Sequence, residues 1–248
     1  MAKGSHGDVR APNQKHRTPL SLREAGDRPR VWALSPTDLT FLWDECPRCF
    51  YRKVVLGEPR PRSPFPSVFG RIDRAMKQFC LDEPAETLCL EMPSGTLGSA
   101  DRWVKSAPVE LPDVASACIV RGRLDLMVST ENGAVVVDLK TAEPGPAAIE
   151  RYSRQLHAYA LALEHPASGP ATTVSGLGLL CFDPHRYHAD GARASLVGDV
   201  HWLEVPRDDD GFLEFLADVV GLLEQGAVPL PAVGCPWCSW RGSADAST

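Results

Sequence analysis

The sequence predicts an α/β fold in which helices precede and interrupt a sheet of mixed direction. Two observations carry this prediction. Apolar, β-branched runs at 122–128 and 135–139 flank Asn132-Gly133, the strongest short-range signal for a β-hairpin. Segments with apolar residues at helical spacing, such as 147–164, alternate with further short strand-like runs. A length of 248 residues suits one domain with additions better than two full domains.

The N-terminal region begins with an irregular stretch. Residues 1–30 are polar and rich in glycine, proline and basic residues, so we expect a disordered tail. A helix start follows, because Ser35 suits the N-cap, Pro36 the first helical position and Asp38 the third. We expect this helix to end at Pro47, which cannot continue the hydrogen-bond pattern.

The remaining elements follow from apolar spacing. A helix is predicted over 68–80 with Phe69, Ile72, Met76 and Phe79 on one stripe, and a helix over 147–164 with Tyr152, Leu156, Tyr159 and Leu163 on its buried face. Residues 82–117 are poorly periodic and indicate irregular structure with some strand. Strands are expected over 174–182 and 201–205, and a helix over 211–225. The main domain is assigned to 31–242 and a second disordered tail to 243–248.

Composition excludes few classes of function. Hydrophobic residues make up 44% of the chain and charged residues 23%, which is ordinary for a soluble globular protein. No apolar run approaches the roughly 18 residues that span a bilayer, and the N-terminus lacks the apolar core of a secretory signal. We therefore expect a cytoplasmic protein without membrane contact. The formal charge of −6 neither demands nor excludes a nucleic-acid partner.

Charged side chains gather on one face of the predicted hairpin. With Asn132 and Gly133 as the turn, Asp125 pairs with Lys140, and Asp138 shares their face. Hard divalent cations are held by one or two carboxylates and water, and a lysine can orient that water or offset charge in the transition state. The pattern indicates a metal-dependent hydrolytic site or, equally, the solvated face of an amphipathic hairpin. The opposite face carries Leu124, Leu126, Val128, Val135, Val137 and Leu139.

Two polar residues stand where helical spacing expects apolar ones. Asp73 lies beside the apolar stripe of its helix, and Gln155 lies one turn from two tyrosines. Buried polar groups cost about 1–3 kcal/mol unless they are hydrogen-bonded. Each residue therefore needs a partner, or lies at a helix edge where it reaches water.

Four blocks now occur in a fixed order: Gly70-x-x-Asp73, Gly122-x-x-Asp125, Asp138-x-Lys140 and Gln155-x-x-x-Tyr159. Over roughly residues 35–242 the chain thereby resembles the PD-(D/E)XK nuclease superfamily. The resemblance is to the RecB-like branch, which includes CRISPR-associated adaptation exonucleases and helicase-nuclease domains. It implies a restriction-endonuclease-like core, with a central mixed β-sheet flanked by helices, and cleavage of DNA phosphodiesters dependent on Mg²⁺ or Mn²⁺.

The same resemblance implies roles for individual residues. Asp125 and Asp138 would ligate the metal, the Leu139 carbonyl would add a ligand, and Lys140 would position the attacking water. Gln155 and Tyr159 would contact DNA or brace the site. The branch typically has histidine where this chain has Asp73. A carboxylate also suits a hard cation, so the resemblance implies that Asp73 is a further metal ligand.

Four of the eight cysteines form two pairs at metal-ligand spacing, Cys46/Cys49 and Cys235/Cys238. Because the pairs lie near opposite ends of the chain, they indicate one four-thiolate site that joins the N- and C-terminal regions. The RecB-like branch often carries a 4Fe–4S cluster bound by one N-terminal and three C-terminal cysteines. Here the division is two and two, which also suits zinc, so iron–sulfur and zinc both stand as predictions. Cys80, Cys89, Cys118 and Cys181 are expected to be core thiols.

The expected activity is that of a DNA nuclease, either an exonuclease or an enzyme that favours single strands, in DNA repair, recombination or defence. A basic run consisting of Arg48, Arg52, Lys53, Arg60, Arg62, Arg71, Arg74 and Lys77 would line a DNA channel or form ordinary solvated surface. The alternative is a nuclease-fold module that binds nucleic acid or a helicase-like partner without cutting. A third possibility is a subunit that is active only with a helicase-like or integrase-like protein.

Overall fold

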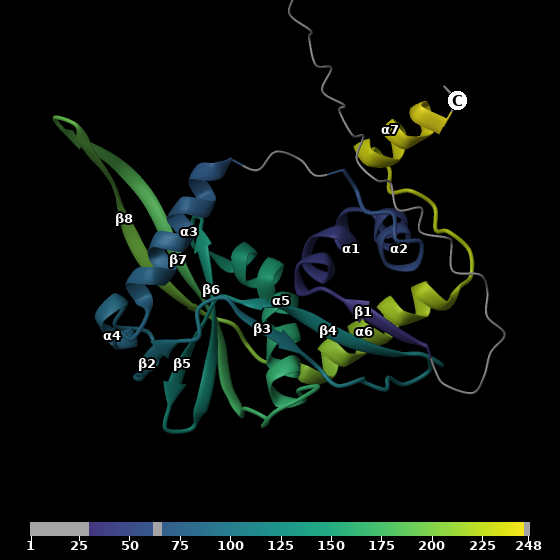
Figure 1. Ribbon diagram of the computed structural model, residues 1–248, viewed down its shortest axis with the longest axis horizontal. Coiled ribbons are helices and arrows are strands. Elements are labelled where there is room, and N and C mark those ends of the chain that lie inside the picture. Colours follow the sequence, from purple (N-terminus) through teal and green to yellow (C-terminus); the bar gives the residue numbers. More distant parts are fainter. Residues whose placement is uncertain (1–29, 62–65, 246–248) are drawn as a thin grey trace, which may run out of the picture.

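Two β-sheets and the helices around them make up the chain in the computed structural model, which describes residues 30–61 and 66–245 (Figure 1). The smaller sheet has strand order β1-β4-β3 and the larger sheet β2-β5-β6-β7-β8. The strands are β1 (Val31–Leu34), β2 (Thr96–Gly98), β3 (Arg102–Lys105), β4 (Ala117–Leu124), β5 (Leu126–Thr130), β6 (Gly133–Thr141), β7 (Val174–Asp190) and β8 (Arg193–Glu204). The predicted α/β fold with a mixed sheet and flanking helices is confirmed.

The helices are the π-helical η1 (Asp38–Leu42), α1 (Trp43–Glu45), α2 (Pro47–Val55), α3 (Ser67–Cys80), α4 (Ala85–Leu88), α5 (Pro146–Glu164), α6 (Asp209–Glu224) and α7 (Pro236–Asp245). The predicted start at Ser35 is confirmed, since the backbone N–H of Asp38 lies 3.4 Å from the Ser35 hydroxyl. The first helical stretch ends before Pro47, as expected, and Pro47 begins the next helix. No helix in the described part of the chain is long and apolar enough to cross a membrane.

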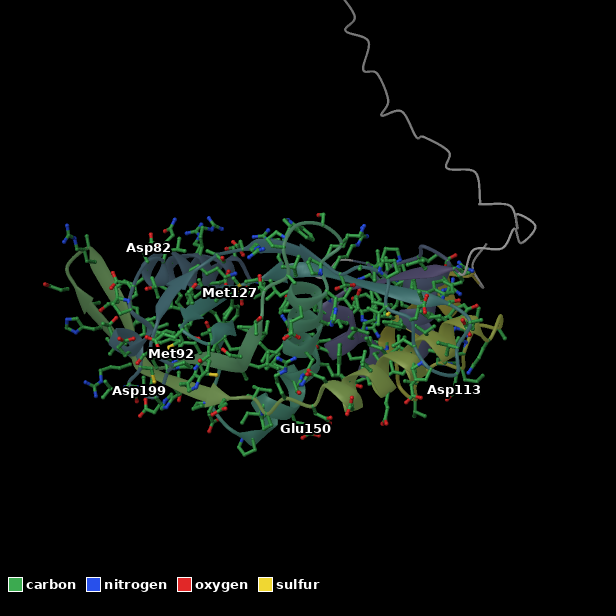
Figure 2. All side chains as sticks on the ribbon, turned by 90° about the horizontal axis from the view of Figure 1, so that it is seen from below. Asp82, Met92, Asp113, Met127, Glu150 and Asp199 are labelled. Atoms are coloured by element: carbon green, nitrogen blue, oxygen red, sulfur yellow. The ribbon has the colours of Figure 1, made fainter. Side chains whose placement is uncertain are left out.

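Both faces of the larger sheet are covered. One face packs on α5 through a cluster that includes Met127, and the other packs on the end of α3 and on α4 through a cluster that includes Met92. Figure 2 labels both methionines among the side chains of this part of the molecule. A third cluster joins the smaller sheet to α2 and α6. The helix α5 connects the parallel strands β6 and β7, as parallel pairing requires.

The two sheets meet at a single residue. Asp125 separates β4, in the smaller sheet, from β5, in the larger sheet. The interruption also corrects the prediction for Leu124, which packs with the α5 cluster instead of sharing the face of Leu126. The change of sheet therefore occurs at one of the predicted site residues.

The hairpin register differs from the prediction by two residues. Thr130 pairs with Gly133, so the turn is Glu131-Asn132, and Leu126 pairs with Val137. The reason is that Gly133 begins β6 at a φ of 130°, where a Cβ atom would lie 2.6 Å from the carbonyl oxygen of Thr173. Asp125 precedes the first paired residue of β5, and a shift of two residues leaves its predicted face unchanged, because residues two apart point the same way.

Two further predictions are corrected. The stripe predicted on α3 faces outward in part, since Phe69 is 44% and Phe79 68% exposed. Lys77 and Cys80 are buried in its place, because the polar side of the helix faces the site described below. The strands predicted over 174–182 and 201–205 are longer and form a β7–β8 arm that extends past the rest of the sheet (Figure 1). The predicted tails lie outside the described residues, except that Arg30 is described and α7 continues to Asp245.

Gly178 on β7 and Gly221 in α6 give a paired test of this packing. A Cβ atom on Gly178 would lie 2.1 Å from the ring of Trp202, whereas one on Gly221 would make an ordinary 3.8 Å contact with Val114. We expect Gly178→Ala to lower the free energy of unfolding by about 1–3 kcal/mol through overpacking. Gly221→Ala should raise it by about 0.5–1 kcal/mol, as for other helix-interior glycines. Urea unfolding measures both, and equal effects of one sign would contradict the described packing.

Candidate functional site

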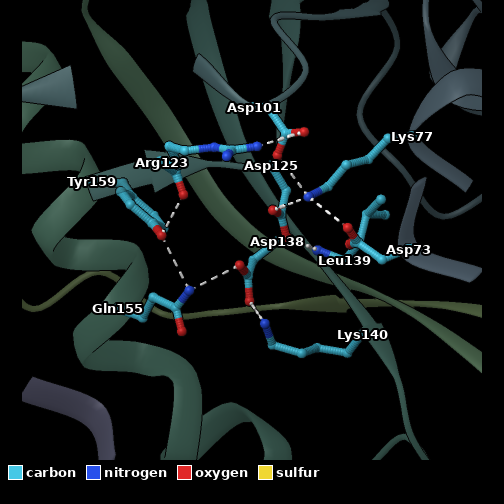
Figure 3. A network of polar contacts seen from close by, with 10 residues as sticks. All are labelled: Asp73, Lys77, Asp101, Arg123, Asp125, Asp138, Leu139, Lys140, Gln155 and Tyr159. Carbon is cyan, nitrogen blue, oxygen red and sulfur yellow. Dashed lines mark hydrogen bonds and ion pairs between the residues drawn. The ribbon is translucent and has the colours of Figure 1, made fainter. Parts of the chain in front are cut away.

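The centre of the site is a pair of carboxylates, Asp125 between β4 and β5 and Asp138 on β6 (Figure 3). The backbone N–H of Leu139 donates to Asp125 Oδ2 at 3.0 Å, which fixes one side of that carboxylate. Asp138 is 1% exposed, and Asp125 lies near enough to raise its pKa. The sequence prediction brought these two acids onto one face, and the structure places them side by side.

Asp138 is held by Gln155 on α5 and by Lys140, two residues along its own strand. Gln155 on α5 donates its Nε2 to Asp138 Oδ1 at 3.1 Å, and the Lys140 ammonium forms an ion pair with Asp138 Oδ2. Burial raises the pKa of Asp138 to about 7, against the opposing effect of Lys140. Burial alone would lower the pKa of Lys140, but attraction to Asp138 and to weaker partners leaves it raised. The Lys140 ammonium also lies 4.4 Å from the ring centroid of Tyr152.

Tyr159 is buried inside the site. Its hydroxyl donates to the carbonyl oxygen of Arg123 at 2.6 Å and accepts from Gln155 Nε2 at 3.2 Å. The glycine of the Gly122-x-x-Asp125 motif leaves room for Pro36 and for the Tyr159 ring, because a Cβ atom there would lie 2.9 Å from the Pro36 ring and 3.1 Å from Cε1 of Tyr159. Of the two roles expected for Gln155 and Tyr159, this geometry suits bracing the carboxylates better than contacting DNA.

A second charge network adjoins Asp125. Lys77 on α3 places its Nζ 2.7 Å from Asp125 Oδ1, 2.9 Å from Asp101 Oδ1 and 3.0 Å from Asp73 Oδ2. Arg123 also binds Asp101, at 2.8 Å. Burial opposes the charge on Lys77, but the carboxylates around it leave its pKa raised. Asp73, predicted as a metal ligand, has Lys77 as its partner in this structure.

Sequence reasoning missed Lys77, Asp101 and Arg123 as members of the site. Lys77 had a signal, since Asp73 and Lys77 stand four residues apart on one helix, a spacing typical of ion pairs. Asp101 had no such signal in the sequence, because it lies in an irregular turn with a φ of 55°. It belongs to the site because its backbone N–H donates to the carbonyl oxygen of Asp125. The sequence indicated that Asp73 and Gln155 each need a polar partner. The structure provides Lys77 for Asp73 and Asp138 for Gln155.

An opening reaches this network from outside. A cavity of about 280 Å³ lies between α3 and β6, with Lys140 among the residues that line it. The lining residues are Phe69, Gly70, Asp73, Met76, Leu139, Lys140 and Thr141. Asp73 is the one carboxylate among these lining residues, while Asp138 is paired with Lys140 and Asp125 with Lys77. Carboxylate oxygens suit a hard divalent cation, so the Asp125 and Asp138 carboxylates fit Mg²⁺ or Mn²⁺.

The four paired cysteines form a second candidate metal site, far along the chain from the first. Each pair has the same local design, in which the first cysteine precedes a helix, proline follows it, and the second cysteine lies in the first turn of α2 or α7. The four sulfur atoms lie within 4.8 Å of one another. This is the one such group of potential ligands in the described part of the chain, and it joins Cys46 and Cys49 to Cys235 and Cys238 as predicted.

The pKa shifts of the four cysteines differ. The backbone N–H of Ala232 lies 3.4 Å from Cys46 Sγ, and Arg60 Nη2 lies 3.9 Å from Cys235 Sγ. Burial opposes ionisation of Cys46, but hydrogen bonds from backbone N–H groups and neighbouring thiols outweigh it and lower the pKa of Cys46 to about 7. Burial raises the pKa values of Cys49 and Cys238. Because the thiolate is the form that binds metal, Cys46 is the cysteine best prepared for an ion. The other four cysteines are buried and unpaired, as expected of core thiols.

The predicted basic run does not form one continuous surface. Four members are engaged by acids: Arg52 with Glu58, Lys53 with Asp38, Arg60 with Glu45, and Lys77 with the acids described above. Arg62 lies outside the described residues. Arg71 and Arg74 are exposed on α3, the helix that carries Asp73. A contact of this run with DNA therefore falls to the α3 arginines first.

Comparison with known proteins completes the description. No curated protein matches the chain. Among solved structures, the one described as "Crystal structure of SSO0001" is 12% identical, covers 78% of this chain and 77% of its own, and superposes with a TM-score of 0.40. A family model described as PD-(D/E)XK nuclease superfamily matches residues 99–243, which include Asp125, Asp138 and Lys140. Since the match spans more than half of the sequence, the chain belongs to the PD-(D/E)XK nuclease superfamily.

Proposed function

We propose that the protein is a DNA nuclease that depends on Mg²⁺ or Mn²⁺, either an exonuclease or an enzyme that favours single strands, acting in DNA repair, recombination or defence. The observation that carries this proposal is the pair formed by Asp138, which is buried, and Asp125, which is partly buried, with Lys140 lining a cavity beside them. Family membership supports hydrolysis of phosphodiester bonds. A module that only bound nucleic acid would have no need to keep a carboxylate such as Asp138 buried, because burying a charge is costly.

Each residue has a role in the proposed reaction. Asp125 and Asp138 would hold the cation, with the Leu139 carbonyl as a further ligand, and the cation would supply Lewis-acid polarisation and a more acidic bound water. Lys140 would orient the attacking water and offset charge on the phosphate from the cavity side. Gln155 and Tyr159 keep Asp138 in place from within the core.

We further propose that the four cysteines hold zinc in place of the iron–sulfur cluster that the resemblance suggested. Three sulfur pairs lie 3.6, 3.7 and 3.8 Å apart. A tetrahedron of sulfurs 2.3 Å from one zinc ion has edges of about 3.8 Å. In a 4Fe–4S cluster each cysteine binds a different iron atom, so the four sulfurs stand farther apart. The spacing therefore supports a single ion.

Cleavage assays test the nuclease proposal. Asp138→Asn keeps an oxygen that can accept from Gln155 but removes the charge that holds the cation, and Lys140→Met removes the group that orients water. We expect each to lower the cleavage rate about 100-fold or more, as the loss of other transition-state interactions does. Asp210→Asn, an exposed acid in the first turn of α6, is the matched control.

The assay uses labelled single- and double-stranded DNA with Mg²⁺, Mn²⁺ or EDTA. Products that require the cation and vanish in both variants support the proposal, and the preferred strand and end define the mode of cleavage. If folded wild-type protein gives no products with either cation, the non-cleaving module or the partner-dependent subunit becomes the better account. Adding a helicase-like or integrase-like partner then separates those two.

The α3 arginines test the DNA path. Arg71 and Arg74 are expected to bind phosphates, so replacing both by alanine should make DNA binding weaker and less dependent on salt. The slope of log K against log salt should decrease in magnitude by about 0.7–0.9 for each phosphate that an arginine no longer neutralises. Binding is measured in the Asp138→Asn background to prevent cleavage, with Lys105→Ala on β3 as a control for general loss of charge. An unchanged slope in the double variant would show that DNA takes another path.

Elemental analysis tests the cysteine proposal. Protein purified without oxygen should contain one zinc ion per chain and little iron, and Cys235→Ser should lose the zinc and melt at a lower temperature. Cys80→Ser, outside the cluster, should keep its zinc. Four iron atoms with inorganic sulfide and a visible charge-transfer absorption would instead identify a 4Fe–4S cluster.

A further inference from the structure

Lys77 has an environment unlike that of the other basic residues in its run. Its ammonium has three N–H donors, and three carboxylates lie 2.7, 2.9 and 3.0 Å from its nitrogen. Its side chain is 9% exposed. Its charge is therefore met inside the protein by a hydrogen bond to Asp101 and by ion pairs with Asp73 and Asp125.

The three acids come from separate parts of the chain. Asp73 lies on α3, Asp101 in the turn before β3, and Asp125 at the junction of the sheets. Asp101 is itself fixed by Arg123 and by its backbone bond to Asp125. Figure 3 shows the Lys77 ammonium at the point where the three carboxylates converge. Three acids brought together without a cation would repel one another, so the arrangement depends on the lysine.

We propose that Lys77 is a positioning residue that serves as a built-in cation of the nuclease site. It takes the place that a further divalent ion would otherwise occupy beside Asp125, and Asp73 is a ligand of Lys77 and not of the catalytic metal. The inference rests on the proposed metal-dependent nuclease function. It limits the site to one divalent cation, held by Asp125 and Asp138.

The balance of charge supports this assignment. Asp73, Asp101, Asp125 and Asp138 face Lys77, Lys140 and Arg123, so with all four carboxylates ionised the acids exceed the bases by a single charge. One dication reverses that small excess, whereas two would leave a strongly positive site. Lys140 differs from Lys77, because it pairs with one carboxylate and lines the cavity, where it can meet substrate.

Binding of Mn²⁺, followed by electron paramagnetic resonance, tests the role of Asp73. The full-length protein should bind one Mn²⁺ that is lost in Asp138→Asn. Asp73→Asn should leave the affinity within about threefold, because Lys77 keeps two carboxylates, whereas removal of a metal ligand or its close support typically costs 10–100-fold. Asp125→Asn is the positive control for such a loss.

A second variant tests the lysine itself. Lys77→Met keeps the length of the side chain and removes its charge, which leaves Asp73, Asp101 and Asp125 without a cation. We expect the number of bound Mn²⁺ ions to rise from one to two, a change that a purely structural lysine would not produce. Circular dichroism checks the fold, and should Lys77→Met fail to fold, the Asp73→Asn affinity decides.

The outcomes separate this inference from the function on which it rests. One ion in the wild type, an unchanged Asp73→Asn affinity and a second ion in Lys77→Met support the inference. Two ions in the wild type, a tenfold or greater loss in Asp73→Asn, or a single ion in folded Lys77→Met would overturn it while leaving the nuclease proposal intact. No Mn²⁺ sensitive to Asp138→Asn would overturn both.

Discussion

The rest of the site depends on the carboxylate of Asp138, which is buried in the core. A charge in that position is tolerated only with good partners, and removing one partner of a buried pair typically costs about 3–5 kcal/mol. Lys140 and Gln155 meet that need, Gln155 also donates to the hydroxyl of Tyr159, and Tyr159 donates in turn to a backbone carbonyl of β4. One buried charge thus links β6, α5 and β4.

The alternation of the hairpin was enough to predict which site residues share a face. The error in the turn shifted the register by two residues, and the shared face survived because side chains along a strand repeat every two residues. The turn itself could not be predicted locally. It depends on the approach of Thr173 to Gly133, two residues from segments far apart in the sequence.

The misassigned face of α3 has a different cause. Apolar spacing normally marks the buried side of a helix, but on α3 Lys77 and Cys80 are buried and Phe79 is exposed, because the acids of the site need Lys77. The arm formed by the ends of β7 and β8 escaped prediction because its residues are exposed and leave no burial pattern. For the cysteines, spacing predicted the four ligands, whereas the choice between one ion and a cluster needed the distances between sulfur atoms.

Asp125 lies between the two sheets and therefore couples the smaller sheet to the larger one. The smaller sheet packs in the same core as the paired cysteines, through residues such as Cys118 and Val120 on β4. The larger sheet carries Asp138. Any tilt of one sheet against the other must therefore alter the gap between the two carboxylates. If the cysteines hold an ion as proposed, its loss would loosen the smaller sheet and so weaken binding of the proposed cation at Asp125 and Asp138. The position of the Asp125 carboxylate therefore depends on the packing of both sheets.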